Sequence, residues 1–234
     1  MRTGHIARLA VSAGALAAAA GAALADDHAQ APLDAVMMRF PDISQSHIVF
    51  AYANDLWIVD KTGGTATPLA APQGAETFPR FSPDGQEIAF VGNYEGGRDL
   101  YTIAAPGAPS SGIANRVTYH PFSERLSDWV QNPDGSTSLL FSSAERAGIT
   151  RAADLYRVSP DGGRPEMLPV PYGSNASISP NGEWLAYTPS DRDFRTWKRY
   201  RGGLASNVWL FNLNTMESRQ VTTWEGTDTQ PMWV

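Results

Sequence analysis

The sequence predicts an all-β fold, a β-propeller made of four-stranded antiparallel blades. The first observation is a strand phrase, Asp-Leu-aromatic-x-β-branched with close variants, found at residues 55–59, 99–103, 154–158 and 207–211. The second is a turn-and-strand phrase built on Ser-Pro-Asp/Asn-Gly, found at 81–90 and 178–187 with a weaker copy at 132–141. The third is their alternation, which gives a period of about 40 to 50 residues with several short strands in each, as in propeller blades.

Each repeat has the same internal order. The Ser-Pro-Asp/Asn-Gly segment predicts a tight turn, because proline presets φ and glycine accepts a positive φ. A strand follows, then a connector of variable length, the Asp-Leu-aromatic strand, a Gly-Gly or Asn-rich turn and a fourth strand. The second strands are expected at 87–91, 138–141 and 184–187. The expected blades lie near 33–72, 75–119, 122–170 and 172–223.

Residues 230–234 resemble residues 78–81, and 228–234 are expected to form the first strand of a next blade. Propellers close into rings of about 4 to 8 blades, each of which is buried against its neighbours. About four blades and one strand leave such a ring incomplete. We therefore expect a partial β-propeller over 26–234, as a fragment of a longer protein.

Residues 1–25 have the pattern of a secretory signal peptide. Arg2 and Arg8 give a positive start, residues 9–24 are apolar and rich in alanine, and 23–25 form a small-x-small cleavage site. The apolar run is shorter than the ~20 residues that a membrane-spanning helix needs, so no stable membrane insertion is expected. Export of a chain without cysteine fits a bacterial periplasm, which is the expected location.

Composition excludes several kinds of chemistry. Loss of residues 1–25 removes two arginines and no acid, so the net charge of −6 becomes −8, which disfavours nucleic acid as a partner. The chain has no cysteine and therefore no thiol nucleophile, and it has no Gly-x-Ser-x-Gly elbow. His28, His47 and His120 are scattered and expected in turns or on the surface. We expect no catalytic residue, cofactor or metal in this segment.

The connectors between the second and third strands lengthen along the chain and predict a working face. The longest includes residues 191–203, with five cations and three aromatics in 13 residues. Three interpretations stay open: docking to another domain of the chain, contact with a carboxylate or peptide ligand, or a surface loop paired within itself. The candidate docking or peptide-contact residues are Arg192, Arg195, Trp197, Lys198, Arg199, Tyr200 and Arg201.

The tryptophans other than Trp197 are expected in blade cores, Trp224 among them. Because the aspartate of the Asp-Leu-aromatic phrase recurs in successive repeats, we interpret it as structural and not catalytic.

The sequence resembles two groups of propellers. The phrases at 81–90 and 99–103 resemble the repeats of TolB-like (PD40) propellers and of the propellers in prolyl oligopeptidase-like enzymes. A narrower resemblance is carried by 37–44 (MMRFPDIS), by 194–203 (FRTWKRYRGG) followed by Asn207-Val208-Trp209, and by 227–233 (TDTQPMW). These segments are similar to the N-terminal propeller of bacterial Tricorn protease homologues, peptidases of the S41 type.

The Tricorn resemblance implies a parent with a six-bladed propeller first, then a second propeller, a PDZ-like module and a serine peptidase core that trims oligopeptides. The catalytic serine and histidine of that hydrolase lie beyond residue 234, so whether this chain counts as an enzyme is left open. The expected role in proteolysis is substrate access or domain docking. Peptides or other domains of the parent are the expected partners, and a homo-oligomeric parent is left open. The alternatives are a TolB-like periplasmic protein-binding propeller, the propeller cap of a prolyl oligopeptidase-like enzyme, and, by family analogy, a cytoplasmic location.

Overall fold

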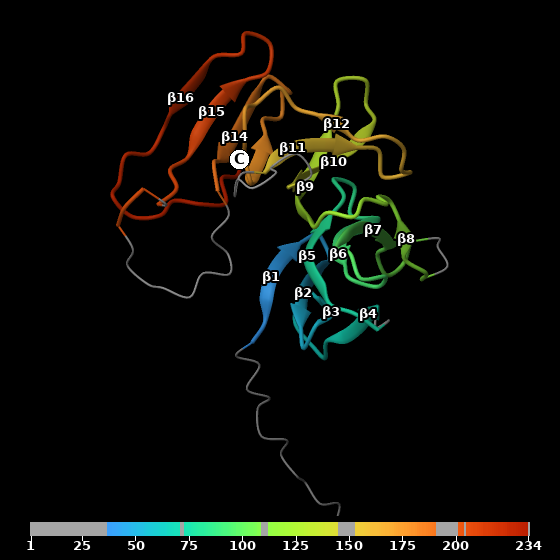
Figure 1. The fold of residues 1–234 in the computed structure, drawn as a ribbon. Coiled ribbons are helices and arrows are strands. Elements are labelled where there is room, and N and C mark those ends of the chain that lie inside the picture. Colours follow the sequence, from blue (N-terminus) through green and yellow to red (C-terminus); the bar gives the residue numbers. More distant parts are fainter. Residues whose placement is uncertain are drawn as a thin grey trace, which may run out of the picture. The chain divides into compact units, whose positions relative to one another are not determined.

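A computed structural model describes residues 37–70, 73–108, 112–144, 153–190, 201–203 and 205–233. It confirms the all-β prediction: these residues form four antiparallel sheets of four strands each, in the order of the chain (Figure 1). Blade 1 contains β1 (Arg39–Ile43), β2 (His47–Tyr52), β3 (Asp55–Asp60) and β4 (Thr67–Ala70); blade 2 contains β5 (Glu76–Phe81), β6 (Glu87–Gly92), β7 (Asp99–Ala104) and β8 (Asn115–Arg116). Blade 3 contains β9 (Glu124–Gln131), β10 (Thr137–Ser143), β11 (Asp154–Val158) and β12 (Glu166–Met167); blade 4 contains β13 (Asn175–Ile178), β14 (Trp184–Thr188), β15 (Trp209–Asn212) and β16 (Ser218–Gln220).

The Ser-Pro-Asp/Asn-Gly phrase forms the turn between the first two strands of a blade. In blade 2 the Ser82 hydroxyl donates to Asp84 at 2.6 Å and accepts the Glu87 backbone N–H at 2.9 Å. The glycine of the turn, Gly85, has a φ of 71°, a conformation that a side chain disfavours. The matching turn of blade 4 has the same hydroxyl contact, from Ser179 to Asn181. The turn residues thus fix the register of the strand pair that follows.

Three apolar cores hold the sheets together, each shared by two consecutive blades. Leu56 of blade 1 packs in one cluster with Phe90 of blade 2, and Leu100 of blade 2 shares another with Phe141 of blade 3. The third core joins Leu155 of blade 3 to residues of blade 4. Among the described residues no such cluster joins blade 4 to blade 1, so these sheets do not close a ring.

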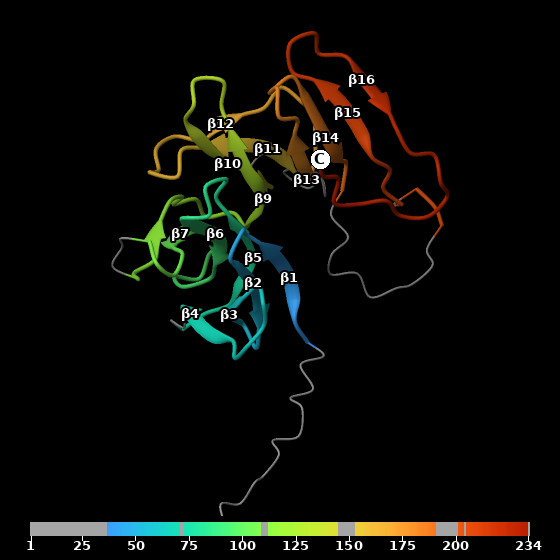
Figure 2. The ribbon, with the colours of Figure 1, turned by 180° about the vertical axis from the view of Figure 1, so that it is seen from behind.

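The first strands of consecutive blades contact one another, β1 with β5, β5 with β9 and β9 with β13, as Figures 1 and 2 show from opposite sides. The Phe81 backbone N–H donates to the Asp42 carboxylate at 2.7 Å, and the Trp129 indole N–H donates to the Arg80 carbonyl at 2.9 Å. Both β1 and β5 contain an irregularity in which a phenylalanine before proline, Phe40 or Phe78, has a positive φ of 51° or 54°. This irregularity turns the strand locally.

Residues 228–233 repeat three features of a blade's opening segment, although they form no strand. Gln230, which precedes a proline, has a φ of 56°. The Asp228 backbone N–H donates to the Ser206 carbonyl at 2.8 Å, as Glu76 donates to Asn54. The Trp233 indole N–H donates to the Ser177 carbonyl of β13 at 2.9 Å. The segment therefore contacts blade 4 much as β9 contacts blade 2, while the opening strand expected at 228–234 stays a prediction.

One core prediction was wrong. Trp224 is 62% exposed, because it lies after the last strand of blade 4 and not within a sheet, whereas Trp129 is buried. The described residues include no helix with the length and apolar character of a membrane span. The predicted signal peptide, residues 1–25, lies outside the described residues.

Candidate functional site

A glutamate begins the first strand in both blade 2 and blade 3. The backbone N–H of Glu76 donates to the carbonyl of Asn54 at 2.8 Å, and that of Glu124 donates to the carbonyl of Arg98 at 3.0 Å. In each case the acceptor directly precedes the Asp-Leu-aromatic phrase of the previous blade. The two glutamates thus occupy equivalent places, at the joint between one blade and the next.

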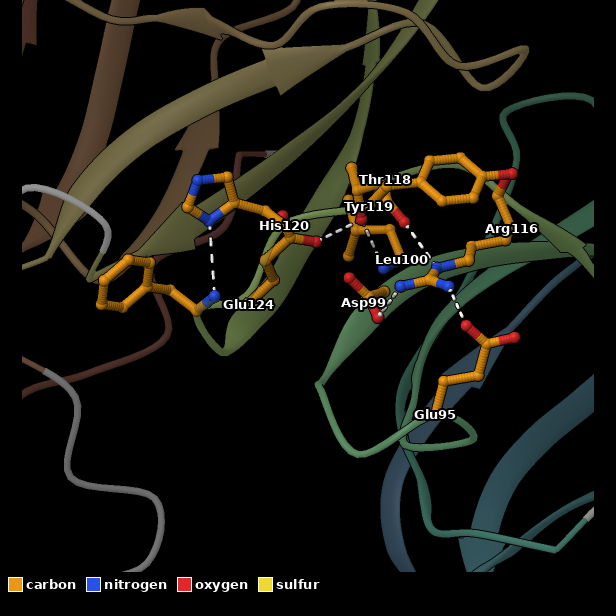
Figure 3. A network of polar contacts seen from close by, with 9 residues as sticks. Glu95, Asp99, Leu100, Arg116, Thr118, Tyr119, His120 and Glu124 are labelled. Atoms are coloured by element: carbon orange, nitrogen blue, oxygen red, sulfur yellow. Dashed lines mark hydrogen bonds and ion pairs between the residues drawn. The ribbon is translucent and has the colours of Figure 1, made fainter.

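Both carboxylates are buried, and both satisfy a backbone donor of the preceding blade. One Glu76 oxygen accepts the Leu56 backbone N–H at 2.7 Å. At the next joint a threonine is interposed: the Leu100 N–H donates to the Thr118 hydroxyl at 2.8 Å, and that hydroxyl donates to Glu124 (Figure 3). A buried N–H without an acceptor is costly, so these glutamates and the threonine stabilise the joints.

Arg116 lies beside the joint between blades 2 and 3 and forms ion pairs with two acidic residues (Figure 3). Its guanidinium pairs with the fully buried Asp99 at 2.9 Å and with the exposed Glu95, and its Nε donates to the Thr118 carbonyl at 2.9 Å. Burial raises the pKa of Asp99, and the charge of Arg116 opposes that rise. This aspartate of the strand phrase therefore has a buried ion pair, while its interpretation as a structural residue stays a prediction.

The electrostatics of Glu124 differ from those of a surface acid. Burial raises the pKa of Glu124 to about 7, while the hydrogen bond from Thr118 lowers it and the nearby charge of Asp99 raises it further. A group with this pKa exchanges its proton near neutral pH, which makes it a functional-site candidate. Structural networks also shift pKa values, so geometry must decide its role.

Glu124 lines a cleft of about 560 Å³, a size typical of small-ligand sites. The polar lining consists of Thr118, His120, Glu124, Ser143 and Arg164. The apolar and aromatic lining consists of Tyr119, Phe141, Tyr156, Pro165 and Met167. Aromatic walls with a few polar groups suit a ligand that has a flat apolar body and one hydrogen-bonding end.

His120 lines the cleft, although the sequence suggested only a turn or surface histidine. Its ring stacks on that of Phe122 with centroids 5.4 Å apart, and its Nδ1 accepts the Phe122 backbone N–H at 3.3 Å. His47, in contrast, lies at the start of β2 with its ring beside the Ser46 hydroxyl, 2.8 Å away. No group of three or more acidic, histidine or cysteine side chains among the described residues could hold a metal ion.

The cation-rich loop predicted from the sequence is mostly outside the described residues, which leave out 191–200. This applies to Arg192, Arg195, Trp197, Lys198, Arg199 and Tyr200. Arg201 is described: it is exposed and pairs with Glu225 at 2.9 Å. Sequence reasoning missed Thr118 and Glu124, and the signal that could have found them is the glutamate shared by residues 76 and 124 at the head of two repeats.

The fold and its joints define a class, the β-propellers built of four-stranded antiparallel blades. The family model for the Tricorn protease N-terminal β-propeller domain matches residues 35–234. The chain belongs to that family.

Comparisons with curated relatives and with solved structures also find Tricorn proteins. The chain is 28% identical to "Putative tricorn protease homolog 2" of Streptomyces coelicolor over 180 residues, which is 74% of this chain and 15% of that protein. It is 22% identical to "Putative Tricorn-like protease N-terminal subunit" of Sulfurisphaera tokodaii, over 70% of this chain and 80% of that protein. The crystal structure of the tricorn protease is similar at a TM-score of 0.70 and 23% identity, over 84% of this chain and 19% of that chain. A putative TolB from Agrobacterium tumefaciens is similar at 0.57 and 19%, over 75% and 60%.

The chain therefore spans only 15% and 16% of the two Streptomyces coelicolor Tricorn homologues that it matches.

Proposed function

We propose that this chain is the leading propeller segment of an exported Tricorn-like serine peptidase that degrades oligopeptides, and that it acts in substrate access or domain docking without itself being catalytic. The observation that carries the proposal is the family match over 35–234, which covers all four sheets. The length of the Streptomyces homologues supports a parent in which other domains provide the peptidase chemistry.

The docking part of the proposal has support of its own. The matched relative from Sulfurisphaera tokodaii is named as an N-terminal subunit, and the chain covers most of it. By analogy with a subunit of that name, we propose that this propeller segment binds a catalytic partner or domain. The predicted loop with Arg195, Trp197 and Arg199 has the composition of a protein interface, in which arginine and aromatic residues are enriched.

The test is peptide hydrolysis by the parent protein and by the 234-residue chain, with fluorogenic peptides of several lengths. We expect turnover by the parent and none by the chain alone. A parent without the propeller segment should cleave with an altered dependence on peptide length. A mock preparation from cells that lack the gene controls for contaminating peptidases. Turnover by the chain above that control, or an unchanged length dependence, would contradict the proposal.

A second candidate is a periplasmic protein-binding propeller of the TolB kind, which the likeness of fold to TolB favours. The third alternative is the propeller cap of a prolyl oligopeptidase-like enzyme. The three alternatives predict different domains in the parent gene downstream of this chain. A PDZ-like module and a peptidase core in the downstream reading frame support the Tricorn proposal. A single closed propeller supports the TolB-like function, and a Gly-x-Ser-x-Gly elbow supports the cap.

A further inference from the structure

Blade 2 contains a tyrosine that fills the space beside its own joint glutamate. The Tyr94 ring lies 4.7 Å from the Tyr101 ring and 6.4 Å from the Phe90 ring, measured between centroids. Its hydroxyl donates to the second oxygen of Glu76 at 2.5 Å. Because Leu56 satisfies the other oxygen, the carboxylate has partners on both sides. In blade 2, therefore, a phenol ring of the chain itself occupies the space beside the joint glutamate.

Blade 3 repeats the walls of that site residue by residue. In blade 2, Glu76 is paired with Gly92 across the strands and Phe90 with Tyr101. In blade 3 the corresponding pairs are Glu124 with Ser143 and Phe141 with Tyr156. The two aromatic pairs have nearly the same geometry, with centroids 5.8 and 5.5 Å apart and ring planes at 22° and 23°.

The two blades differ in what lies in the space beside the joint glutamate. The four blade 3 residues line the cleft of about 560 Å³, whereas in blade 2 the Tyr94 side chain lies in the corresponding space. The connector of blade 3, residues 144–153, contains no phenylalanine, tyrosine or tryptophan, so it cannot supply a ring. The strand partner of the wall tyrosine also differs. In blade 2, Tyr101 is paired with Arg116, whereas in blade 3, Tyr156 is paired with Met167. An apolar side chain therefore takes the place of a cation.

We propose that the cleft between blades 2 and 3 binds a phenol ring, in the form of a tyrosine side chain of a peptide. The ring packs against Phe141 and Tyr156, and its hydroxyl donates a hydrogen bond to Glu124, as Tyr94 does to Glu76. An ionised carboxylate has about four lone-pair sites, so the hydrogen bond from Thr118 leaves room for another donor. The proposal stands independently of a role in a peptidase, because it concerns binding by this chain alone.

The chemistry of the walls favours a phenol over related ligands. A phenylalanine side chain fits the same walls but leaves Glu124 without the added donor. Arg164 also lines the cleft, but a ligand carboxylate at the position of the phenol hydroxyl meets the negative charge of Glu124 when that group is ionised. Free phenols and tyrosine within a peptide share the recognised group, so the experiment includes both.

The experiment measures affinities by isothermal titration calorimetry of the 234-residue chain. Four ligands are titrated separately: N-acetyl-tyrosinamide, N-acetyl-phenylalaninamide, p-cresol and a capped Gly-Tyr-Gly peptide. We expect the tyrosine amide to bind at least about fivefold more tightly than the phenylalanine amide, the worth of one buried hydrogen bond. Tighter binding of the peptide than of p-cresol supports a peptide ligand. Equal or weaker binding of the peptide overturns that part of the proposal. Equal affinities for tyrosine and phenylalanine, or no saturable binding, overturn the site.

Two matched variants locate the site. At about pH 8, where the Glu124 carboxyl is ionised, Glu124→Gln removes the charge of the acceptor and should weaken binding of the tyrosine amide several-fold, because hydrogen bonds to charged groups are about twice as strong. Glu76→Gln makes the same change at the equivalent, internally occupied position and should leave the affinity unchanged. An affinity unaffected by Glu124→Gln, or reduced equally by both variants, contradicts the assignment.

A further measurement needs no variant. Amide chemical shifts of the wild-type chain should change on addition of the tyrosine amide around Thr118, Glu124 and Ser143. Shifts confined to blade 1 or blade 4 would place the ligand elsewhere and overturn the proposal.

Discussion

The hydroxyl of Tyr94 donates to the carboxylate of Glu76 at 2.5 Å, and this contact completes the joint between blades 1 and 2. Burial and the hydrogen bond to Glu76 raise the pKa of Tyr94 well above its ordinary value, so the phenol remains a donor throughout the physiological range. Burial likewise raises the pKa of Glu76, against the effect of the hydrogen bonds from Tyr94 and Leu56. The joint is therefore held by buried polar groups that satisfy one another.

Removal of the Tyr94 hydroxyl should destabilise the fold. Tyr94→Phe leaves one oxygen of the buried Glu76 without its donor, which we expect to lower the free energy of unfolding by about 1 to 3 kcal/mol. Urea denaturation of the wild-type and variant chains measures the difference. Tyr119→Phe is the control, because Tyr119 is 74% exposed and its hydroxyl contact, to the Arg116 carbonyl, is long at 3.4 Å. Equal stability of Tyr94→Phe and the wild type would show that the contact contributes nothing.

Glu124 should make stability depend on pH in an unusual direction. Its folded-state pKa of about 7 lies above the ordinary 4.5, so the folded chain holds this proton more tightly than the unfolded chain does. The stabilisation from the protonated form is fully present below about pH 4.5 and is lost as the pH rises through about 7. The shift corresponds to a loss of about 3 kcal/mol at most.

Glu124→Gln tests this dependence, because glutamine stays neutral at every pH. The free energy of unfolding of the variant, relative to that of the wild type, should rise between pH 5 and pH 8 by up to about 3 kcal/mol. Denaturation curves at the two pH values give the difference. Glu225→Gln, which makes the same change at the exposed partner of Arg201, is the control. A constant or falling difference for Glu124→Gln would contradict the assigned direction.

The fold was predictable because its signals are local and repeated. Turns such as Ser82 to Gly85 contain their own hydrogen-bonding side chains and a glycine at positive φ, so a short segment specifies them. The alternation of such turns with strand phrases then predicted an all-β propeller. Trp224 was misplaced because repetition of residue type was taken as repetition of structure.

The cleft was harder to predict, because it depends on a residue that one repeat has and another lacks. The Glu124 carboxylate is linked to the Leu100 backbone N–H through the Thr118 hydroxyl, a contact that no local pattern encodes. An alignment of the repeats on their first strands would have paired Glu76 with Glu124. The connector of blade 3 has no aromatic residue equivalent to Tyr94. The importance of this difference is visible only in the structure, where Tyr94 lies in the space beside Glu76.

Export is a separate prediction from the sequence. When the full gene is expressed in a bacterium with its secretion machinery, residues 1–25 should be removed and the protein recovered from the periplasm with Asp26 at its N-terminus. Mass spectrometry of the fractionated protein measures the cleavage point. A variant with Ala23 and Ala25 changed to bulky residues should keep the leader, because the cleavage site needs small side chains. An uncleaved protein in the cytoplasm would favour the cytoplasmic alternative.

The cation-rich loop gives the last prediction. In the parent protein, replacement of Arg195, Trp197 and Arg199 together by alanine should alter domain assembly or peptide processing and leave the blades folded. Loss of an interface cluster of arginine and tryptophan is expected to weaken docking by about 2 kcal/mol or more, a factor of about 30 in affinity. Size-exclusion chromatography, peptide turnover and circular dichroism measure assembly, activity and fold.

Two controls separate docking from general effects of charge and from the loop's own ion pairs. Lys61→Ala removes an exposed cation from blade 1 and should change neither assembly nor turnover. Arg201→Ala breaks the exposed pair with Glu225, which contributes at most about 1 kcal/mol, so any larger effect on assembly must come from contacts with a partner. If the triple variant assembles and cleaves like the wild type, the loop is a surface segment paired within itself. If it unfolds, the loop stabilises the blades and does not act as a docking element.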